Sequence, residues 1–189
     1  MKEHKKIKVR IEGTAPLLMN RFTESAGVDI QAKARKRSGS CLGPKERAEE
    51  LLYTIPSGSK KTVAQPAEHF YACMVKAATN YRIGGKGKKT YKDLVKGCMD
   101  VYPELIPHVN QAWIVDSRPV VNPSTRGRVM RHRPRLENWA LEFEIVSRDE
   151  QLGPAEIKQF LEYAGEYIGI GDYRPRFGRF RVASFKPEK

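Results

Sequence analysis

The sequence predicts an α+β fold with a βαββαβ core, which is the ferredoxin-like arrangement. Two kinds of pattern support this prediction: segments in which apolar and polar residues alternate, as in strands with one buried face, and segments with apolar residues at helical spacing. The expected elements are a strand at 6–12, a helix at 67–80, strands at 111–116 and 138–147, a helix at 154–167 and a strand at 178–185. Because 189 residues suffice for one sizeable core, we expect a single domain spanning 1–189.

The first strand is indicated by Ile7, Val9 and Ile11, which alternate with charged residues until Gly13. Segment 23–43 then has no apolar period, and it contains a dense run of basic residues. We interpret it as a mobile basic insertion. A specific contact, a solvated insertion and a localisation signal remain open as its role.

The next region is expected to hold short elements. Segment 44–54 predicts a short helix with Pro44 at its start, because proline is tolerated in the first turn of a helix. A brief strand at 51–55 and a basic turn at 57–61 are expected to follow.

The helix at 67–80 is predicted to be amphipathic. Its apolar face consists of Phe70, Cys73, Met74, Ala77 and Tyr81. Cys73 is expected to pack in the core rather than to react. A flexible basic loop at 82–89 and a second helix at 90–99 should follow.

An arginine-rich segment, 117–136, lies between the two middle strands. It contains no acidic residue, and its arginines are Arg118, Arg126, Arg128, Arg131, Arg133 and Arg135. We predict a hairpin insertion whose charge is neutralised by a polyanion, because uncompensated cations repel one another. A solvated hairpin without a binding function is the alternative.

A glycine-rich turn joins the last helix to the last strand. Between Gly169 and Val182, arginines and aromatic residues are interspersed with glycines, and Asp172 is the one acidic residue. Glycine permits backbone conformations and close approaches that a side chain blocks. The stretch therefore predicts a surface for phosphates and bases, although an ordinary helix-to-strand turn would explain the glycines as well.

The net charge of +13 and the pI of about 9.8 predict a polyanionic partner, and nucleic acid is the expected one. An anionic membrane is disfavoured, because the sequence has no basic amphipathic helix and no apolar run of about 20 residues. The N-terminus lacks a signal-peptide core, so we expect a cytoplasmic protein. Cys41, Cys73 and Cys98 have neither the number nor the spacing of a disulfide framework or a zinc site.

The stretch from Gly169 to Val182, with its Gly-x-Gly, basic turn and Phe-Gly-Arg-Phe, resembles the glycine-rich loop of the RAMP superfamily. These are RNA-binding proteins of CRISPR effector complexes with an RRM-like fold, and the nearest likeness is to the backbone subunit that polymerises along the guide RNA. The run 14–21 resembles the family's first loop, which lies against the guide. The sequence departs from the family at 172–175, where a more glycine-rich run is usual.

The resemblance also assigns a role to the arginine-rich hairpin. It corresponds to the thumb of the family, which crosses the guide and displaces a base at regular intervals. Val129 or Met130 is then the expected apolar wedge.

Three functions follow as hypotheses. The resemblance implies a non-catalytic backbone subunit of a CRISPR-type ribonucleoprotein effector in antiviral defence, which binds guide RNA and complementary nucleic acid and oligomerises with itself and other subunits. The second is a stand-alone single-stranded nucleic-acid-binding protein of the kind that a phage encodes. The third is an endoribonuclease that cuts target RNA with a loop acid, Asp29 or Glu24. Catalysis is disfavoured, because the sequence shows no clustered carboxylates or paired histidines.

We expect no cofactor, no metal ion and no catalytic residue. The residues expected to bind RNA are Asn20, Arg21, Lys33, Arg35, Lys36, Arg37, Arg82, Lys86, Lys88, Arg126, Arg128, Arg131, Arg133, Gly169, Gly171, Arg174, Arg176, Phe177, Gly178 and Arg179. The arginines and lysines would neutralise phosphates, and the glycines would let backbone N–H groups approach them.

Overall fold

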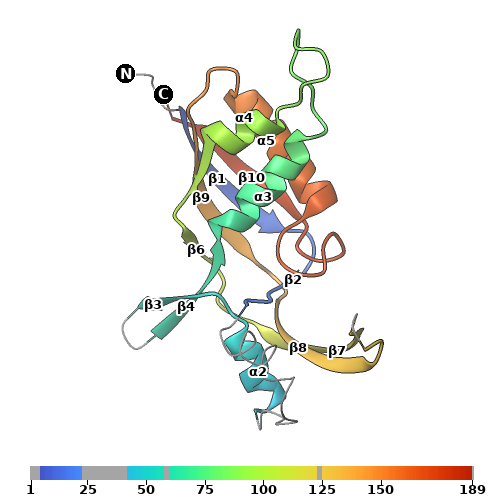
Figure 1. The fold of residues 1–189 in the computed structure, drawn as a ribbon. Helices are drawn as coiled ribbons and strands as arrows, with labels where there is room; N and C mark the ends of the chain where they lie inside the picture. Colours follow the sequence, from blue (N-terminus) through green and yellow to red (C-terminus); the bar gives the residue numbers. More distant parts are fainter. Residues whose placement is uncertain (1–4, 23–41, 58–59, 123–124, 189) are drawn as a thin grey trace.

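The computed structural model describes residues 5–22, 42–57, 60–122 and 125–188 (Figure 1). The fold class is α+β, as predicted. The strands are β1 (Lys5–Gly13), β2 (Leu17–Leu18), β3 (Thr54–Ser57), β4 (Lys60–Pro66), β5 (Met99–Tyr102), β6 (Leu105–Pro107), β7 (Ile114–Val121), β8 (Arg128–Leu136), β9 (Ala140–Ser147) and β10 (Phe180–Pro187). The helices are α2 (Pro44–Glu50), α3 (Ala67–Ala78), α4 (Lys92–Cys98) and α5 (Pro154–Tyr163), which continues as a π-helical turn, η1 (Ala164–Ile168).

The main sheet has four antiparallel strands in the order β10-β1-β9-β5. The alternation that predicts β1 also sets its register, because Ile7 lies opposite Ile145 and Ile11 lies opposite Leu141, so that apolar residues share one face. Helices α3 and α5 cover this face (Figure 1). The opposite face of the sheet carries the charged residues of β1.

The core lies between this sheet and the two helices. Phe70 of α3 stacks on Phe143 of β9 with ring centroids 4.7 Å apart, and Phe180 of β10 meets Phe70 edge-on at 6.2 Å. Cys73 lies fully buried beside them, and burial raises the pKa of its thiol to about 12. A thiol in this state is protonated and unreactive, which agrees with a packing role.

One core strand was predicted in the wrong place. The strand that pairs with β9 at the edge of the sheet is β5, at 99–102, rather than the segment 111–116. The end of that segment begins β7 instead, where Ile114 is 53% exposed. β5 has four residues and follows α4 directly, so it is too short to show the alternation typical of a strand. The apolar run at 113–115 has the composition of a strand, and the prediction was therefore placed there.

The remaining elements are distributed unequally between the two ends of the molecule. β2, α2, the β3–β4 pair and the β7–β8 hairpin gather at one end, and the basic loop between α3 and α4 lies at the other (Figure 1). Strands β4 and β6 pair with each other and were not predicted. Within the described part of the chain, no helix has the length and apolarity needed to cross a bilayer.

Candidate nucleic-acid interface

The arginine-rich segment forms an antiparallel hairpin of β7 and β8, in which Val120 lies opposite Val129 and Arg118 lies opposite Arg131. β8 then continues and pairs with β2, so that Leu17 lies opposite Leu136. Both leucines are fully buried. The hairpin is therefore attached to the segment that follows the first strand, and its base is packed into the protein.

The arginines at the base of the hairpin are compensated, contrary to the expectation from the sequence. Asp116 precedes the acid-free segment by one residue and is 7% exposed. Arg118 Nε donates a hydrogen bond to Asp116 Oδ1 at 2.5 Å, and Arg135 lies 3.5 Å from the same carboxylate. These arginines, Arg118 first, hold the pKa of Asp116 below its usual value.

A second acid reaches the hairpin from the glycine-rich turn. Arg133 Nε lies 2.7 Å from Asp172 Oδ2, and both side chains are largely buried. The contact is an ion pair without the alignment of a hydrogen bond. Arg133 was expected to bind RNA. In the structure its guanidinium group is paired with Asp172, and this ion pair joins the turn to β8.

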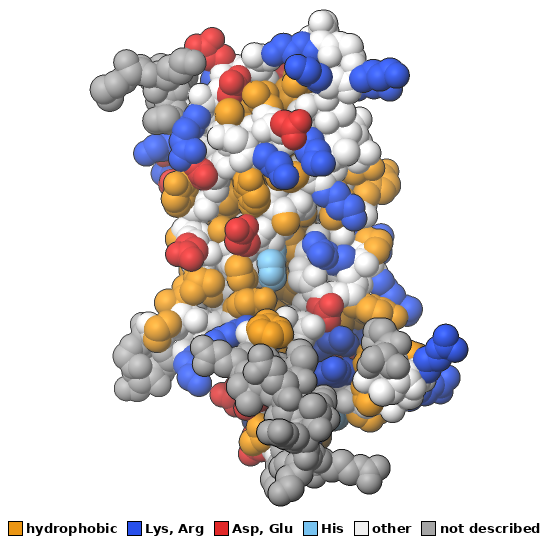
Figure 2. All heavy atoms as spheres, viewed as in Figure 1, with side chains coloured by type: hydrophobic (Ala, Val, Ile, Leu, Met, Phe, Trp, Pro, Cys, Tyr) orange, Lys and Arg blue, Asp and Glu red, His pale blue; other side chains and the backbone are white. Residues whose placement is uncertain are grey.

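The remaining hairpin arginines lie toward the tip and differ from those at the base. Arg126, Arg128 and Arg131 are exposed, and none has an acidic partner among the described residues. Figure 2 shows Lys and Arg side chains gathered over this end of the hairpin. Val129 and Met130, the expected wedge residues, are also exposed here, at 38% and 54%.

The glycines of the turn allow close packing of the chain. Gly169, Gly171 and Gly178 have φ values of 70°, 76° and 73°, in the left-handed region that favours glycine. A Cβ atom at Gly178 would lie 1.8 Å from the carbonyl oxygen of Ile170, and one at Gly171 would lie 2.5 Å from that of Leu18. The turn is therefore folded tightly on itself and on β2.

The backbone N–H groups of Gly169 and Gly178 are engaged within the protein. Gly178 donates to the Pro16 carbonyl at 2.8 Å, and Gly169 donates to the Ala164 carbonyl at 2.8 Å. The N–H of Asp172 donates to the Leu18 carbonyl at 2.8 Å. The expectation that Gly169 and Gly178 offer N–H groups to phosphates is therefore wrong, because both groups already have acceptors and both residues are buried.

The aromatic residues of the turn have different environments. Phe177 is 7% exposed, and the guanidinium carbon of Arg118 lies 4.8 Å from its ring centroid. Its ring is thus covered by the protein, and little of its surface is open to a ligand. Tyr173 is 50% exposed, and Arg174, Arg176 and Arg179 are exposed as well.

The β7–β8 hairpin, the glycine-rich turn and the segment after β2 enclose a groove of about 730 Å³. It is lined by four parts of the chain that are distant in sequence: 20–22, Leu51 after α2, the hairpin at 118–133, and Tyr173 of the turn. Of the residues expected to bind RNA, it brings together Asn20, Arg21, Arg131 and Arg133. Arg118, Phe22 and Tyr173 line it too, although they were not among the residues expected to bind RNA. The sequence feature that could have drawn attention to Tyr173 is its position in the run 172–175, where the sequence departs from the family pattern.

Other expected residues do not join this groove. Arg82, Lys86 and Lys88 lie in the loop at the far end of the molecule, where Lys86 Nζ donates to Gln151 Oε1 at 2.6 Å (Figure 1). Lys33, Arg35, Lys36 and Arg37 lie outside the described residues, as do Glu24 and Asp29. The groove is therefore defined by the hairpin, the turn and the segment after β1.

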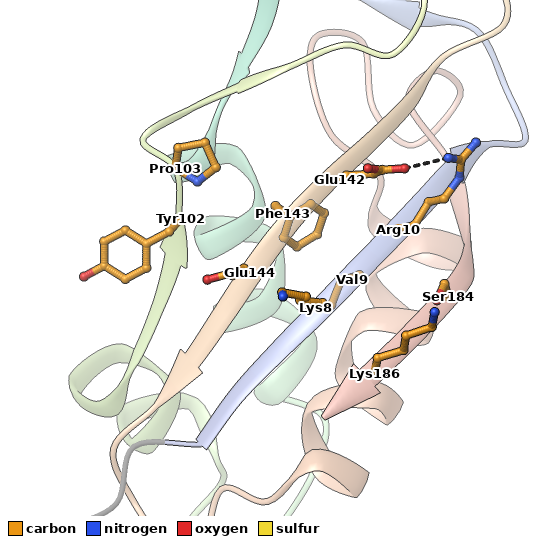
Figure 3. Close-up of a pocket in the computed structure, with 10 residues that line it drawn as sticks. All are labelled: Lys8, Val9, Arg10, Tyr102, Pro103, Glu142, Phe143, Glu144, Ser184 and Lys186. Atoms are coloured by element: carbon orange, nitrogen blue, oxygen red, sulfur yellow. Dashed lines mark hydrogen bonds and ion pairs between the residues drawn. The ribbon is translucent and has the colours of Figure 1, made fainter. Parts of the chain in front are cut away.

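A second hollow, of about 860 Å³, lies on the face of the main sheet that the helices leave open (Figure 3). Lys8, Arg10 and Lys186 share it with Glu142 and Glu144. Arg10 Nη1 lies 2.6 Å from Glu142 Oε1, and the dashed line in Figure 3 marks this contact. Because anions and cations are interspersed, this face lacks the single-sign field that attracts a polyanion.

Among the described residues, no group of three or more His, Cys, Asp and Glu side chains is arranged to hold a metal ion. The two histidines near the core are also placed unlike an acid–base pair. His108 is 3% exposed, and burial lowers its pKa to about 4. His69 exchanges a hydrogen bond with Gln65, and burial, followed by the charge of Arg174, lowers its pKa.

No protein-family model and no curated protein sequence matches this chain. Its fold does match solved structures. A chain of the cryo-EM structure of the Type III-B Cmr-beta bound to cognate target RNA superposes with a TM-score of 0.57 at 13% identity, over 99% of this chain and 61% of that chain. A chain of a CRISPR RNA-guided surveillance complex gives a TM-score of 0.47 at 11% identity, over 95% of this chain and 66% of that one.

The first of these similarities establishes a shared fold. The resemblance to CRISPR effector subunits that the glycine-rich stretch predicts is thus confirmed in the arrangement of the backbone. This chain spans 61% of the length of the Cmr-beta chain.

Proposed function

We propose that this chain is an RNA-binding backbone subunit of a CRISPR-type ribonucleoprotein effector. The observation on which the proposal depends is the groove of about 730 Å³, to which Arg21, Arg131 and Tyr173 contribute from three separate segments. Arg21 and Arg131 are exposed there, without an acidic partner among the described residues. Guanidinium groups in this situation are suited to bind phosphates.

The fold supports the proposal. The strand order β10-β1-β9-β5 places the first and third core strands at the centre and the last and second at the edges, as in a ferredoxin-like core. The Cmr-beta chain that shares the fold comes from a complex bound to its cognate target RNA. In the proposed complex, base pairing between the guide and the complementary strand supplies sequence specificity.

The proposed roles of the residues differ from those expected from the sequence. Arg21, Arg126, Arg128, Arg131, Arg174, Arg176 and Arg179 bind phosphates in this proposal. Arg133, Phe177, Gly169 and Gly178 position them instead, because their charge, ring or N–H groups are engaged within the protein. Repetition of the chain along the guide would place successive grooves on successive stretches of RNA.

The test is to purify the protein from its host and to sequence the nucleic acid that accompanies it. A uniform short RNA with a repeat-derived end is the expected result. Heterogeneous fragments would support a stand-alone single-stranded nucleic-acid-binding protein, which would use the same groove. Protein free of nucleic acid, with no affinity for added single-stranded RNA at low salt, would contradict both functions.

A further inference from the structure

Tyr173 has a backbone conformation that is unusual for its residue type. Its φ is 59°, in the left-handed region, where a bulky non-glycine residue is rarely found. The surrounding chain imposes this conformation, because Asp172 N–H is bonded to the Leu18 carbonyl and Phe177 N–H donates to the Tyr173 carbonyl at 3.3 Å. A large side chain kept at a position that favours glycine points to a function of the side chain.

The ring of Tyr173 is supported from within the protein but is not enclosed by it. Its centroid lies 5.8 Å from that of Phe177 and 5.8 Å from the guanidinium carbon of Arg118. Arg118 is itself fixed by the buried carboxylate of Asp116. The ring is therefore positioned in advance while half of its surface stays exposed, so a ligand that contacts it needs to order little of the protein.

The lining of the groove combines charge with apolar surface. Arg21 and Arg131 provide cations, whereas Val120 and Val129, which lie opposite each other on the two strands of the hairpin, provide apolar surface. An unpaired nucleotide has the same two components, an anionic phosphate and a flat apolar base. Binding of phosphates would explain the exposed arginines of the groove. It would not explain the exposed ring of Tyr173, which needs an apolar group of the ligand.

We infer that Tyr173 is a stacking platform for an unpaired base of the bound RNA, held in the groove beside the arginines that bind its phosphate. The inference rests on the proposed RNA-binding function and adds a base contact to it. Every base has a π-face, so stacking on one aromatic ring tolerates any sequence. This suits a subunit that must accept guides of different sequence.

The experiment compares two single-stranded ligands of equal length, an oligouridine RNA and the same backbone without bases. The proteins are the parent, Tyr173→Phe and Tyr173→Leu, at one salt concentration. All three residues have a Cβ and are branched beyond it, so the strain at φ 59° is retained in each variant. Thermal unfolding verifies that each variant is folded.

The parent and Tyr173→Phe are expected to bind oligouridine about tenfold more tightly than the abasic backbone. Tyr173→Leu should lose most of that preference while its affinity for the abasic backbone stays the same. If the parent binds both ligands equally, or if Tyr173→Leu keeps the full preference, the stacking role is wrong and the phosphate-binding function survives. If the parent binds neither ligand, the proposed function fails with it.

Discussion

Arg133 of strand β8 and Asp172 of the glycine-rich turn form an ion pair that joins the hairpin to the turn, with Arg133 Nε 2.7 Å from Asp172 Oδ2. The two side chains are only 12% and 29% exposed. Removing one charge therefore leaves the other poorly solvated and unpaired, which costs more than the loss of a surface pair.

Asp172→Asn is accordingly expected to lower the free energy of unfolding by about 1–3 kcal/mol. Chemical denaturation measures it. Glu162→Gln is the matched control, because Lys158 and Glu162 form an exposed pair at 3.8 Å whose loss should leave the denaturation midpoint unchanged. Equal midpoints for Asp172→Asn and the parent would show that the ion pair does not stabilise the junction.

Gly178→Ala should destabilise the protein by about 2 kcal/mol or more, because it combines a left-handed φ of 73° with a clash against the Ile170 carbonyl. Gly97→Ala serves as the control, since Gly97 lies in helix α4 and a Cβ there meets nothing within 4 Å. Alanine at 97 should be neutral or stabilise by up to about 1 kcal/mol. Thermal unfolding of both variants compares them, and a Gly178→Ala protein as stable as the parent would contradict the close packing of the turn.

Arg131→Ala should weaken binding of single-stranded RNA and reduce the slope of log affinity against log salt by about 0.7, the value for one phosphate contact. Lys86→Ala removes the same charge at the far end of the molecule and should change neither quantity by as much. Fluorescence titrations at several salt concentrations give both slopes. Identical slopes for the two variants would mean that net charge, and not the groove, governs binding.

Stability should fall as the pH falls from 6.5 toward 4, because the buried His108 resists protonation until a pKa of about 4 while the unfolded histidine takes up its proton near 6.5. Between these two pH values the unfolded state binds more protons than the folded state. His108 therefore lowers the free energy of unfolding by roughly 3 kcal/mol as the pH falls. His108→Phe keeps a ring beside Trp139 and should remove this part of the pH dependence. Denaturation at pH 7 and pH 4.5 measures it, and an unchanged difference between the two pH values would exclude His108 as its source.

The long elements of the core could be predicted because each buries one face. β1, α3, β9, α5 and β10 all show a period of about two or 3.6 residues, and their boundaries lie within a few residues of those expected. β2 and β5 have two and four residues, too few to establish a period. Their place depends on pairing with β8 and β9, which are distant in the sequence.

The groove could be predicted only in part, for a related reason. Basic residues identified the hairpin and the turn, but the sequence does not say which arginines meet an acid. Asp116 and Asp172 decide that, one from the start of β7 and the other from the turn. Tyr173 depends on the same long-range contacts, because its exposure and position result from the packing of the turn on β2.

The three residues at 16–18 have a consequence for the order of events during synthesis. Pro16 and Leu18 accept hydrogen bonds from Gly178 and Asp172, while Leu17 pairs with Leu136 of β8. A chain still growing on the ribosome can form β1 and the hairpin, but it has no closed groove until residues 169–178 have emerged and docked on 16–18. In the proposed function, a chain without the docked turn has the hairpin arginines but lacks the Tyr173 side of the groove.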